Sequence, residues 1–446
     1  MRQLLKNALV LRDARGAPTA ENIMIDDDRI AGFTLADSVP GYAPVDLSGR
    51  LVIPGFVQAH VHFCQALLRG AADDMALLDW LRTRVWPLEA AHDEESVYLS
   101  ALLAGTELLA GGATCACVME SVRYADAAAR AIDELGLRAV FGKVMMDHTD
   151  TPPELGGLPD SFIETTRQTL DESLRLLKKW HGAAAGRISY AFMPRGVLTT
   201  SEDLLLELRK LSDEYGALVH THACETWPES RLVERRRGQT EIKYLRRLGL
   251  ANERLLLAHC VCVDDEDIHI LSKHRVNVVS CPLANLKLAS GIAPLEKLAD
   301  AGITLSLGSD GPPCNNTLDM FTEMRFASLL QKGALGQPTA MPAPQVFEIA
   351  TLGGAKALGL DGDIGSLAVG KKADLAALDW QQPQTAPQKP CVAGLVYSGG
   401  AHMVTDTMVD GRFVYRHKKH VAVDTAVLRR QAEVALERLT RRFSPG

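Results

Sequence analysis

The sequence lacks a basic excess and lacks any long apolar run. Its 446 residues carry 48 Lys and Arg against 55 Asp and Glu, which gives a net charge of −7. A nucleic-acid-binding surface needs clustered basic charge, so no nucleic-acid partner is expected. No apolar stretch approaches the roughly 20 residues of a membrane span, and the first residues have no signal-peptide core. We therefore expect a cytoplasmic protein without a membrane partner.

The sequence also lacks the spacings of a disulfide framework. Nine cysteines are present, an odd number, and the pairs Cys115/Cys117 and Cys260/Cys262 are spaced C-x-C rather than C-x-x-C. The zinc signature of nucleic-acid deaminases, H-x-E followed by P-C-x-x-C, is missing as well. In a long chain without a secretion signal, reduced and buried thiols are expected.

Short apolar runs alternate with amphipathic helical stretches through the middle of the chain. In stretches such as Ser96–Leu109 and Thr165–Trp180, apolar residues recur at i, i+3 and i+4. Repeated strand–helix alternation predicts an α/β fold in which a parallel sheet closes into a (β/α)₈ TIM-type barrel, placed at residues 56–360. The predicted strands are Leu51–Val61, Thr114–Met119, Ala139–Met145, Ile188–Met193, Leu218–Ala223, Leu255–Cys260, Val276–Ser280 and Thr304–Gly308.

Both ends of the chain depart from this alternation. Residues 1–55 and 361–446 read as short strands joined by polar turns, and the second ends in a predicted helix, Thr425–Arg442. Neither end alone could form a stable β-layer, so the two are expected to pair as one small β-sandwich beside the barrel. The predicted strands are Ala8–Leu11, Asn22–Ile25, Arg29–Phe33, Ala376–Leu378, Val392–Val396, Val404–Val409 and Arg412–Tyr415.

Histidines and a carboxylate stand where the predicted barrel strands end, which is where barrel active sites lie. These residues are His60 and His62 on the first strand, His220 and His222 on the fifth, His259 on the sixth and Asp310 after the eighth. Taken singly, a histidine at a strand end is more often a residue whose hydrogen bonds are satisfied locally, and an aspartate before glycine is more often a turn former. Together, three imidazoles and one carboxylate can bind zinc and leave a position for water.

One divalent metal ion is therefore expected, zinc in the first place, with Fe²⁺ and Mn²⁺ as alternatives, because these ligands suit several first-row ions. Side chains alternate along a strand, so His60 and His62 point to the same face. The same alternation aims His220 and His222 together, and from spacing alone either could be the ligand.

Five motifs resemble the amidohydrolase superfamily: VIPGFVQAHVH, VHTHACET, LLLAHC, LGSDGPPCNN and IGSLAVGKKADLAALD. The resemblance extends over nearly the whole chain. Within the superfamily, the chain resembles the mononuclear aminohydrolases. The resemblance implies the metal ligands His60, His62, His222 and Asp310. It further implies that Asp310 accepts a proton, that Glu225 carries one to a ring nitrogen, and that His259 lies beside the activated water. The fourth strand ends without the lysine of the binuclear branch, so one metal is favoured.

Other segments resemble the deaminases of 5′-deoxyadenosine, methylthioadenosine and S-adenosylhomocysteine, notably residues 63–96 and the motif NLKLASGIAPL. This resemblance implies that Trp80 packs on the sugar or thioether side and that Glu89 accepts hydrogen bonds from ribose hydroxyls. A core position is an equal alternative for Trp80. Arg195 stands where adenosine-type members often have histidine; it could donate to a ring acceptor, as in guanine deaminases, or pair with a loop carboxylate.

We therefore expect a hydrolytic deaminase that releases ammonia from the adenine moiety of 5′-deoxyadenosine, methylthioadenosine, S-adenosylhomocysteine or adenosine. The alternatives are a guanine- or pterin-type deaminase and a triazine hydrolase of the N-ethylammeline type, which displaces chloride or an amine. Glu225 favours amine loss, because a poor leaving group needs ring protonation. A non-enzymatic relative that has lost its ligands is disfavoured by the complete set. The expected partner is a small-molecule substrate, and family resemblance implies a homo-oligomer.

Overall fold

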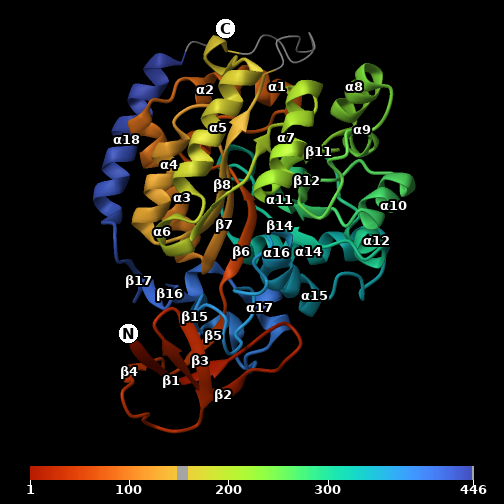
Figure 1. The fold of residues 1–446 in the computed structure, drawn as a ribbon. Helices are drawn as coiled ribbons and strands as arrows, with labels where there is room; N and C mark the ends of the chain where they lie inside the picture. The colour runs from red at the N-terminus through yellow and green to blue at the C-terminus, as the bar shows by residue number, and fades with distance from the viewer. Residues whose placement is uncertain (148–158, 444–446) are drawn as a thin grey trace.

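The computed structural model describes residues 1–147 and 159–443. Two parallel sheets form its centre (Figure 1). The first contains β6 (Phe56–Val61), β7 (Ala113–Glu120), β8 (Arg138–Met145), β9 (Ile188–Tyr190) and β10 (Met193–Pro194); the second contains β11 (Val219–Ala223), β12 (Leu255–His259), β13 (Asn277–Ser280) and β14 (Leu305–Leu307).

The two sheets meet at both edges. Parallel bridges join Phe192 to Val219 on one side and Val61 to Asp310 on the other. This closes the strands into the expected (β/α)₈ barrel, and it places the carboxyl ends of all strands at one rim. Every residue of β6, β7 and β8 is buried, as expected for parallel strands that helices cover from outside.

Helices surround the barrel (Figure 1). Several begin at a polar cap: Asp93 accepts a hydrogen bond from the backbone N–H of Ser96 before α3, and Thr165 from that of Gln168 before α5. The helices are α3 (Glu94–Ala110), α4 (Ala125–Leu135), α5 (Thr166–Trp180), α6 (Ala183–Gly186), α7 (Glu202–Tyr215), α8 (Trp227–Arg237), α9 (Glu241–Arg247), α10 (Asp265–Lys273), α11 (Pro282–Lys287), α12 (Leu295–Asp300), α13 (Pro312–Asn315), α14 (Met320–Leu335), α15 (Ala343–Glu348) and α16 (Gly354–Ala357).

The strands of both chain ends join one nine-stranded sheet, drawn below the barrel in Figure 1. Its central strand β5 pairs with β1 from the first end and with β15 from the second, so the expected pairing of the two ends is confirmed. The strands are β1 (Arg2–Val10), β2 (Thr19–Asp26), β3 (Arg29–Thr34), β4 (Ala43–Asp46), β5 (Arg50–Pro54), β15 (Leu375–Asp379), β16 (Val404–Val409), β17 (Arg412–Arg416) and β18 (Lys419–His420). The exact domain boundaries stay a prediction.

Two strand predictions need correction. The predicted strand Leu51–Val61 is divided at Gly55: β5 belongs to the terminal sheet and β6 begins the barrel. A Cβ at Gly55 would lie 2.2 Å from the side chain of Thr114, so glycine lets the chain pass closely from one sheet to the other. The predicted strand Val392–Val396 is wrong, because these residues open the helix α17 (Val392–Ser398). A short apolar run fits a buried helix as well as a strand.

A segment of short helical turns covers the carboxyl-terminal rim of the barrel. It consists of the 3₁₀-helix η1 (Phe63–Leu68), α1 (Leu77–Trp80), the π-helical turn η2 (Leu81–Val85) and α2 (Trp86–Ala90), and we call it the covering segment. The C-terminal helix α18 (Thr425–Arg442) runs along α3 (Figure 1). Its residue Leu439 packs with Leu68 and Leu88 of the covering segment. No helix within the described residues is long and apolar enough to span a membrane.

A buried ion-pair cluster connects the barrel to the terminal sheet. Arg138 at the start of β8 donates through Nε to Asp374 Oδ2 at 2.8 Å and also contacts Asp410. The side chains of Arg138 and Asp374 are only 5% and 1% exposed. Burial acts to lower the pKa of Arg138, but the two carboxylates hold it above its ordinary value, so the guanidinium stays charged.

Removing one partner of this cluster should destabilise the protein strongly, because a buried carboxylate would lose its counter-charge. We expect Arg138→Leu to lower the free energy of unfolding by about 3–5 kcal/mol. The exposed pair of Arg130 and Glu94 serves as control, and Arg130→Ala should cost less than about 1 kcal/mol. Urea denaturation followed by circular dichroism measures both; equal losses would contradict a special role for Arg138.

Candidate active site

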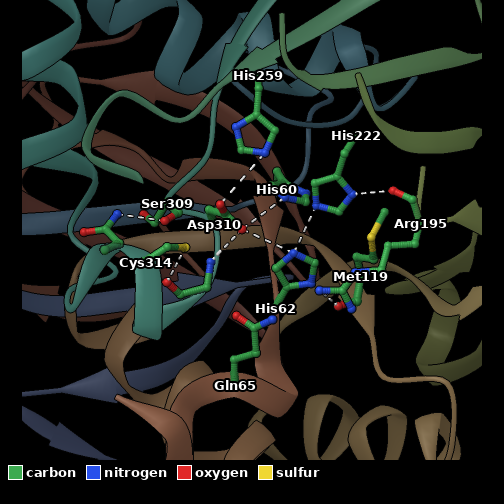
Figure 2. A network of polar contacts seen from close by, with 12 residues as sticks. His60, His62, Gln65, Met119, Arg195, His222, His259, Ser309, Asp310 and Cys314 are labelled. Carbon is green, nitrogen blue, oxygen red and sulfur yellow. Dashed lines mark hydrogen bonds and ion pairs between the residues drawn. The ribbon is translucent and has the colours of Figure 1, made fainter. Parts of the chain in front are cut away.

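Four of the predicted site residues meet at the carboxyl-terminal rim of the barrel. His60 and His62 come from the end of β6, His222 from β11 and Asp310 from the turn after β14. Each offers one ligand atom, and these atoms all lie within 4.8 Å of one another. Figure 2 shows the three imidazoles and the carboxylate converging on one point. The structure thus brings the whole predicted metal-ligand set together.

Hydrogen bonds fix the tautomer of His60 through a second histidine. His220 Nδ1 lies 3.0 Å from the carbonyl oxygen of Leu256, which can only accept, so this nitrogen carries the proton. The Nε2 of neutral His220 is therefore an acceptor, and His60 Nδ1 donates to it at 2.7 Å. This leaves a lone pair on His60 Nε2, which is buried and has no hydrogen-bond partner among the described residues. His220 is thus a support of the site, and His222 is the ligand candidate.

The other two imidazoles are oriented by backbone carbonyls in the same way. His62 Nδ1 donates to the carbonyl oxygen of Met119 at 2.9 Å, and His222 Nδ1 donates to that of Arg195 at 2.6 Å (Figure 2). Their Nε2 atoms lie only 3.3 Å apart, both with lone pairs. Asp310 Oδ1 lies 3.2 Å from His62 Nε2 and 3.4 Å from His60 Nε2.

These atoms fit one divalent cation. Burial lowers the pKa of His60 to about 4 and that of His222 well below its ordinary value, so both rings are neutral. Asp310 is the carboxylate of the set, and it lies buried against His60 and His62. Neutral imidazoles and an ionised carboxylate are the forms that bind metal. The lone pairs of these nitrogen and oxygen atoms lie close together with no proton between them. A cation such as Zn²⁺ would relieve their mutual repulsion.

Glu225 and His259 form a second group next to Asp310. His259 Nε2 lies 3.5 Å from Glu225 Oε2 and 3.9 Å from Asp310 Oδ2, and the three side chains are buried. Burial and the nearby charge of Asp310 raise the pKa of Glu225 well above its ordinary value. The structure therefore places a carboxyl group that holds a proton beside the ligand set, as the predicted proton-transfer role requires.

A cavity opens above this group. His62, His222, Glu225 and Asp310 line its floor, and Leu77, Trp80, Leu81, Trp86 and Leu198 give it an apolar cover. Arg195, Thr199 and Glu229 also border it. Apolar walls with a few convergent polar groups are typical of small-molecule sites.

The three predicted substrate-binding residues lie together at this cavity, but not all border it. Trp80 and Arg195 line it, whereas Glu89 is 3% exposed and is not among the lining residues. Glu89 instead accepts hydrogen bonds from Arg195 at 2.9 Å and from Gln65 at 2.6 Å. Of the two readings left open for Arg195, the pairing with a loop carboxylate is thus present, and the side chain still reaches the cavity wall.

Sequence reasoning missed the aromatic wall residue Trp86 and the wall carboxyl of Glu229. Trp86 belongs to the same covering segment as Trp80, and Arg195 lies over its ring at 5.9 Å. Glu229 lies in the first turn of α8, which begins two residues after Glu225 and so stays close to the rim of the barrel. Burial and the nearby Glu241 and Glu225 raise the pKa of Glu229 well above its ordinary value.

Comparison with known proteins gives consistent matches. The sequence profile of the Amidohydrolase family matches residues 51–414. A 5′-deoxyadenosine deaminase of Methanothermobacter thermautotrophicus is 39% identical over 94% of this chain and 95% of its own length. A 5-methylthioadenosine/S-adenosylhomocysteine deaminase of Desulforudis audaxviator is 36% identical over 98% of this chain and 99% of its own. The crystal structure of an adenosine deaminase from Xanthomonas campestris with bound zinc superposes with a TM-score of 0.90 at 33% identity, over 98% of both chains.

The different positions of His222 and His220 predict different effects on metal binding. His222→Ala should abolish the metal content, because a ligand is lost. His220→Leu should keep a site but weaken metal affinity by about 10- to 100-fold, because His60 loses its orienting acceptor. Metal content by mass spectrometry and chelator competition measure the two effects. His269→Ala, on the exposed face of α10, is the control; full metal content in His222→Ala would refute the ligand assignment.

Proposed function

This chain belongs to the amidohydrolase family, and from this premise we propose that it is a metal-dependent deaminase of purine nucleosides. The proposed substrates are 5′-deoxyadenosine, methylthioadenosine, S-adenosylhomocysteine and adenosine, whose adenine ring loses its amino group as ammonia. One observation carries the proposal: His62, His222, Asp310 and Glu225 line the floor of a single cavity, and the buried imidazoles of His60 and His259 lie against Asp310. The names of the most similar relatives support the substrate class.

The metal would be held by His60, His62, His222 and Asp310, and we propose zinc. The neutral imidazoles and the ionised carboxylate support this choice, as does the zinc bound in the similar deaminase structure. A divalent ion bound there supplies Lewis-acid chemistry, which makes water a nucleophile near neutral pH.

The chain's own residues move the protons of the reaction. Glu225, which holds a proton in its buried position, donates it to the ring nitrogen next to the amino-bearing carbon as water adds to that carbon. Asp310 Oδ2, 3.9 Å from His259 Nε2, is placed to accept a proton from the attacking water. Asp310 then passes the proton it accepted to the amino group, which leaves as ammonia, while the new hydroxyl group returns a proton to Glu225 and becomes the ring carbonyl of the product.

The cavity wall binds and orients the ring. Trp80, Trp86 and Leu198 present apolar surface that excludes water from a planar base. Arg195 keeps guanidinium N–H groups beyond the one that binds Glu89, and these can donate to a purine ring nitrogen. We propose that Glu89, through its buried ion pair with Arg195, sets the position of this donor. Acceptance of hydrogen bonds from ribose hydroxyls is a second proposed role of Glu89.

Arg195 also favours a second candidate, a guanine-type deaminase, because an arginine can donate equally well to a carbonyl oxygen of the base. We further propose that the protein acts on small molecules rather than on nucleic acid or membranes, in the cytoplasm and as a homo-oligomer. The net charge of −7 supports the absence of a nucleic-acid partner.

Ammonia release across a set of substrates tests the proposal. We expect the zinc-loaded protein to deaminate 5′-deoxyadenosine and methylthioadenosine, with S-adenosylhomocysteine and adenosine also accepted. Guanine, pterin and aminotriazines should react at least about 100-fold less well in kcat/KM, since they lack the sugar that fills the cavity. A preference for guanine would move the assignment to the second candidate, and loss of chloride from a chlorotriazine would move it to a triazine hydrolase.

The proton-transfer role of Glu225 predicts a separable defect. Glu225→Gln should bind zinc normally but lower kcat by about 10²- to 10⁴-fold, because the amide cannot protonate the ring. Glu234→Gln removes a carboxylate from an exposed position of α8, the helix that follows Glu225, and serves as the matched control. Metal content and ammonia release are measured on both variants; unchanged turnover in Glu225→Gln would refute the role.

A further inference from the structure

Asn285 on α11 has been assigned no function so far, and its side chain holds His259 in place. His259 Nδ1 and Asn285 Oδ1 lie 2.8 Å apart, and the two residues are 0% and 2% exposed. Because a carboxamide oxygen can only accept a hydrogen bond, Nδ1 is the nitrogen that carries the proton. The ring nitrogen on the other side, Nε2, then has a lone pair.

The free nitrogen of His259 faces the reaction centre. Nε2 is buried and has no hydrogen-bond partner among the described residues, and it lies 3.5 Å from Glu225 Oε2 and 3.9 Å from Asp310 Oδ2. An imidazole in this tautomer offers an acceptor to a water molecule beside Glu225 and Asp310, whereas the opposite tautomer would offer a donor.

Asn285 is itself fixed on both sides along the chain. Its backbone N–H donates to Cys281, and its carbonyl oxygen accepts from the N–H of Ser290 at 2.8 Å. These two hydrogen bonds fix the backbone position from which the Asn285 side chain extends toward His259. His259 also has a left-handed backbone, with φ of 77°, so its ring is presented from a strained strand end that packing must hold.

The three ligand-candidate histidines show the same device with different acceptors. Their Nδ1 atoms donate to Met119, to Arg195 and to His220, two of them through backbone carbonyls. His259 alone among these rings depends on a side-chain amide. Replacement of one side chain can thus change the tautomer of His259 and leave the backbone acceptors of His62 and His222 in place.

We propose that Asn285 is a positioning residue that locks His259 in the Nδ1–H tautomer, so that Nε2 accepts a hydrogen bond from the water molecule that adds to the substrate ring. The inference rests on the proposed deaminase function. It predicts that loss of the Asn285 acceptor impairs the turnover step, because water is then misoriented, while substrate binding and metal binding persist.

Two substitutions of similar size separate this role from a packing role. Asn285→Asp keeps an acceptor oxygen in the same place, and Asn285→Leu fills the space without one. We expect Asn285→Leu to lower kcat by about 100-fold with KM within about threefold of wild type, whereas Asn285→Asp should keep kcat within about tenfold. Zinc content and melting temperature are measured on both variants.

The kinetic result would overturn the inference in either of two cases. The first is wild-type kcat in Asn285→Leu, and the second is a loss in Asn285→Asp as large as that in Asn285→Leu. Loss of zinc from Asn285→Leu as the source of its defect would also overturn it, because the defect would then be one of metal binding.

A spectroscopic readout tests the tautomer without any substrate. In zinc-loaded protein labelled with [¹⁵N]histidine, the resonances missing from His259→Gln identify the ring of His259. We expect them to report a protonated Nδ1 and an unprotonated Nε2 in wild type, and a changed pattern in Asn285→Leu. The opposite tautomer in wild type would overturn the inference even if the enzyme is active. Absence of ammonia release in wild type together with the expected tautomer would instead count against the proposed function.

Discussion

The site depends on one repeated constraint: each imidazole of the ligand set donates a hydrogen bond from Nδ1 to an acceptor that the fold holds in place. Carbonyl oxygens of Met119 and Arg195 impose this on His62 and His222, and the relay from Leu256 through His220 imposes it on His60. The Nε2 lone pairs of the three rings therefore all point toward the predicted metal position. Burial reinforces the arrangement, because protonating any of these rings would place an unsolvated charge in the core.

The barrel supplies these acceptors because parallel strands end at a common rim. The carbonyl groups of Met119 on β7 and of Leu256 on β12 each orient a histidine on an adjacent strand. Close packing completes the geometry: a Cβ at Gly308 would lie 2.7 Å from the carbonyl oxygen of His60, so glycine lets the last strand approach the first. A side chain there would separate Asp310 from its imidazole partners.

Much of this site could be predicted from the sequence, because strand periodicity and strand ends are local properties. His60, His62, Asp310, Glu225 and His259 stand at the ends of apolar runs that are readable without a structure. The choice between His220 and His222 was not readable from spacing, since both share one strand face and only the contact with Leu256 separates a support from a ligand. The pairing of Glu89 with Arg195 joins segments far apart in sequence, and no local pattern encodes it.

The errors have the same origin. Val392–Val396 was expected as a strand because a short apolar run is ambiguous without its neighbours, and it forms part of α17. The strand Leu51–Val61 appeared continuous, because its apolar pattern carries on while the chain passes from one sheet to the other at Gly55. Both cases show that hydrophobicity predicts burial better than it predicts which partner buries a segment.

The division at Gly55 has a consequence for the order of events during synthesis. Strand β5 pairs with β1 on one side and along its length with β15 on the other, so residue 53 faces residue 376, and this second contact cannot form until residue 376 has been made. The first barrel strand, which carries His60 and His62, continues directly from this late-completed strand. The strand before these histidines therefore gains its second neighbour only after the whole barrel has been made, and the full ligand set from His60 to Asp310 likewise exists only late in synthesis.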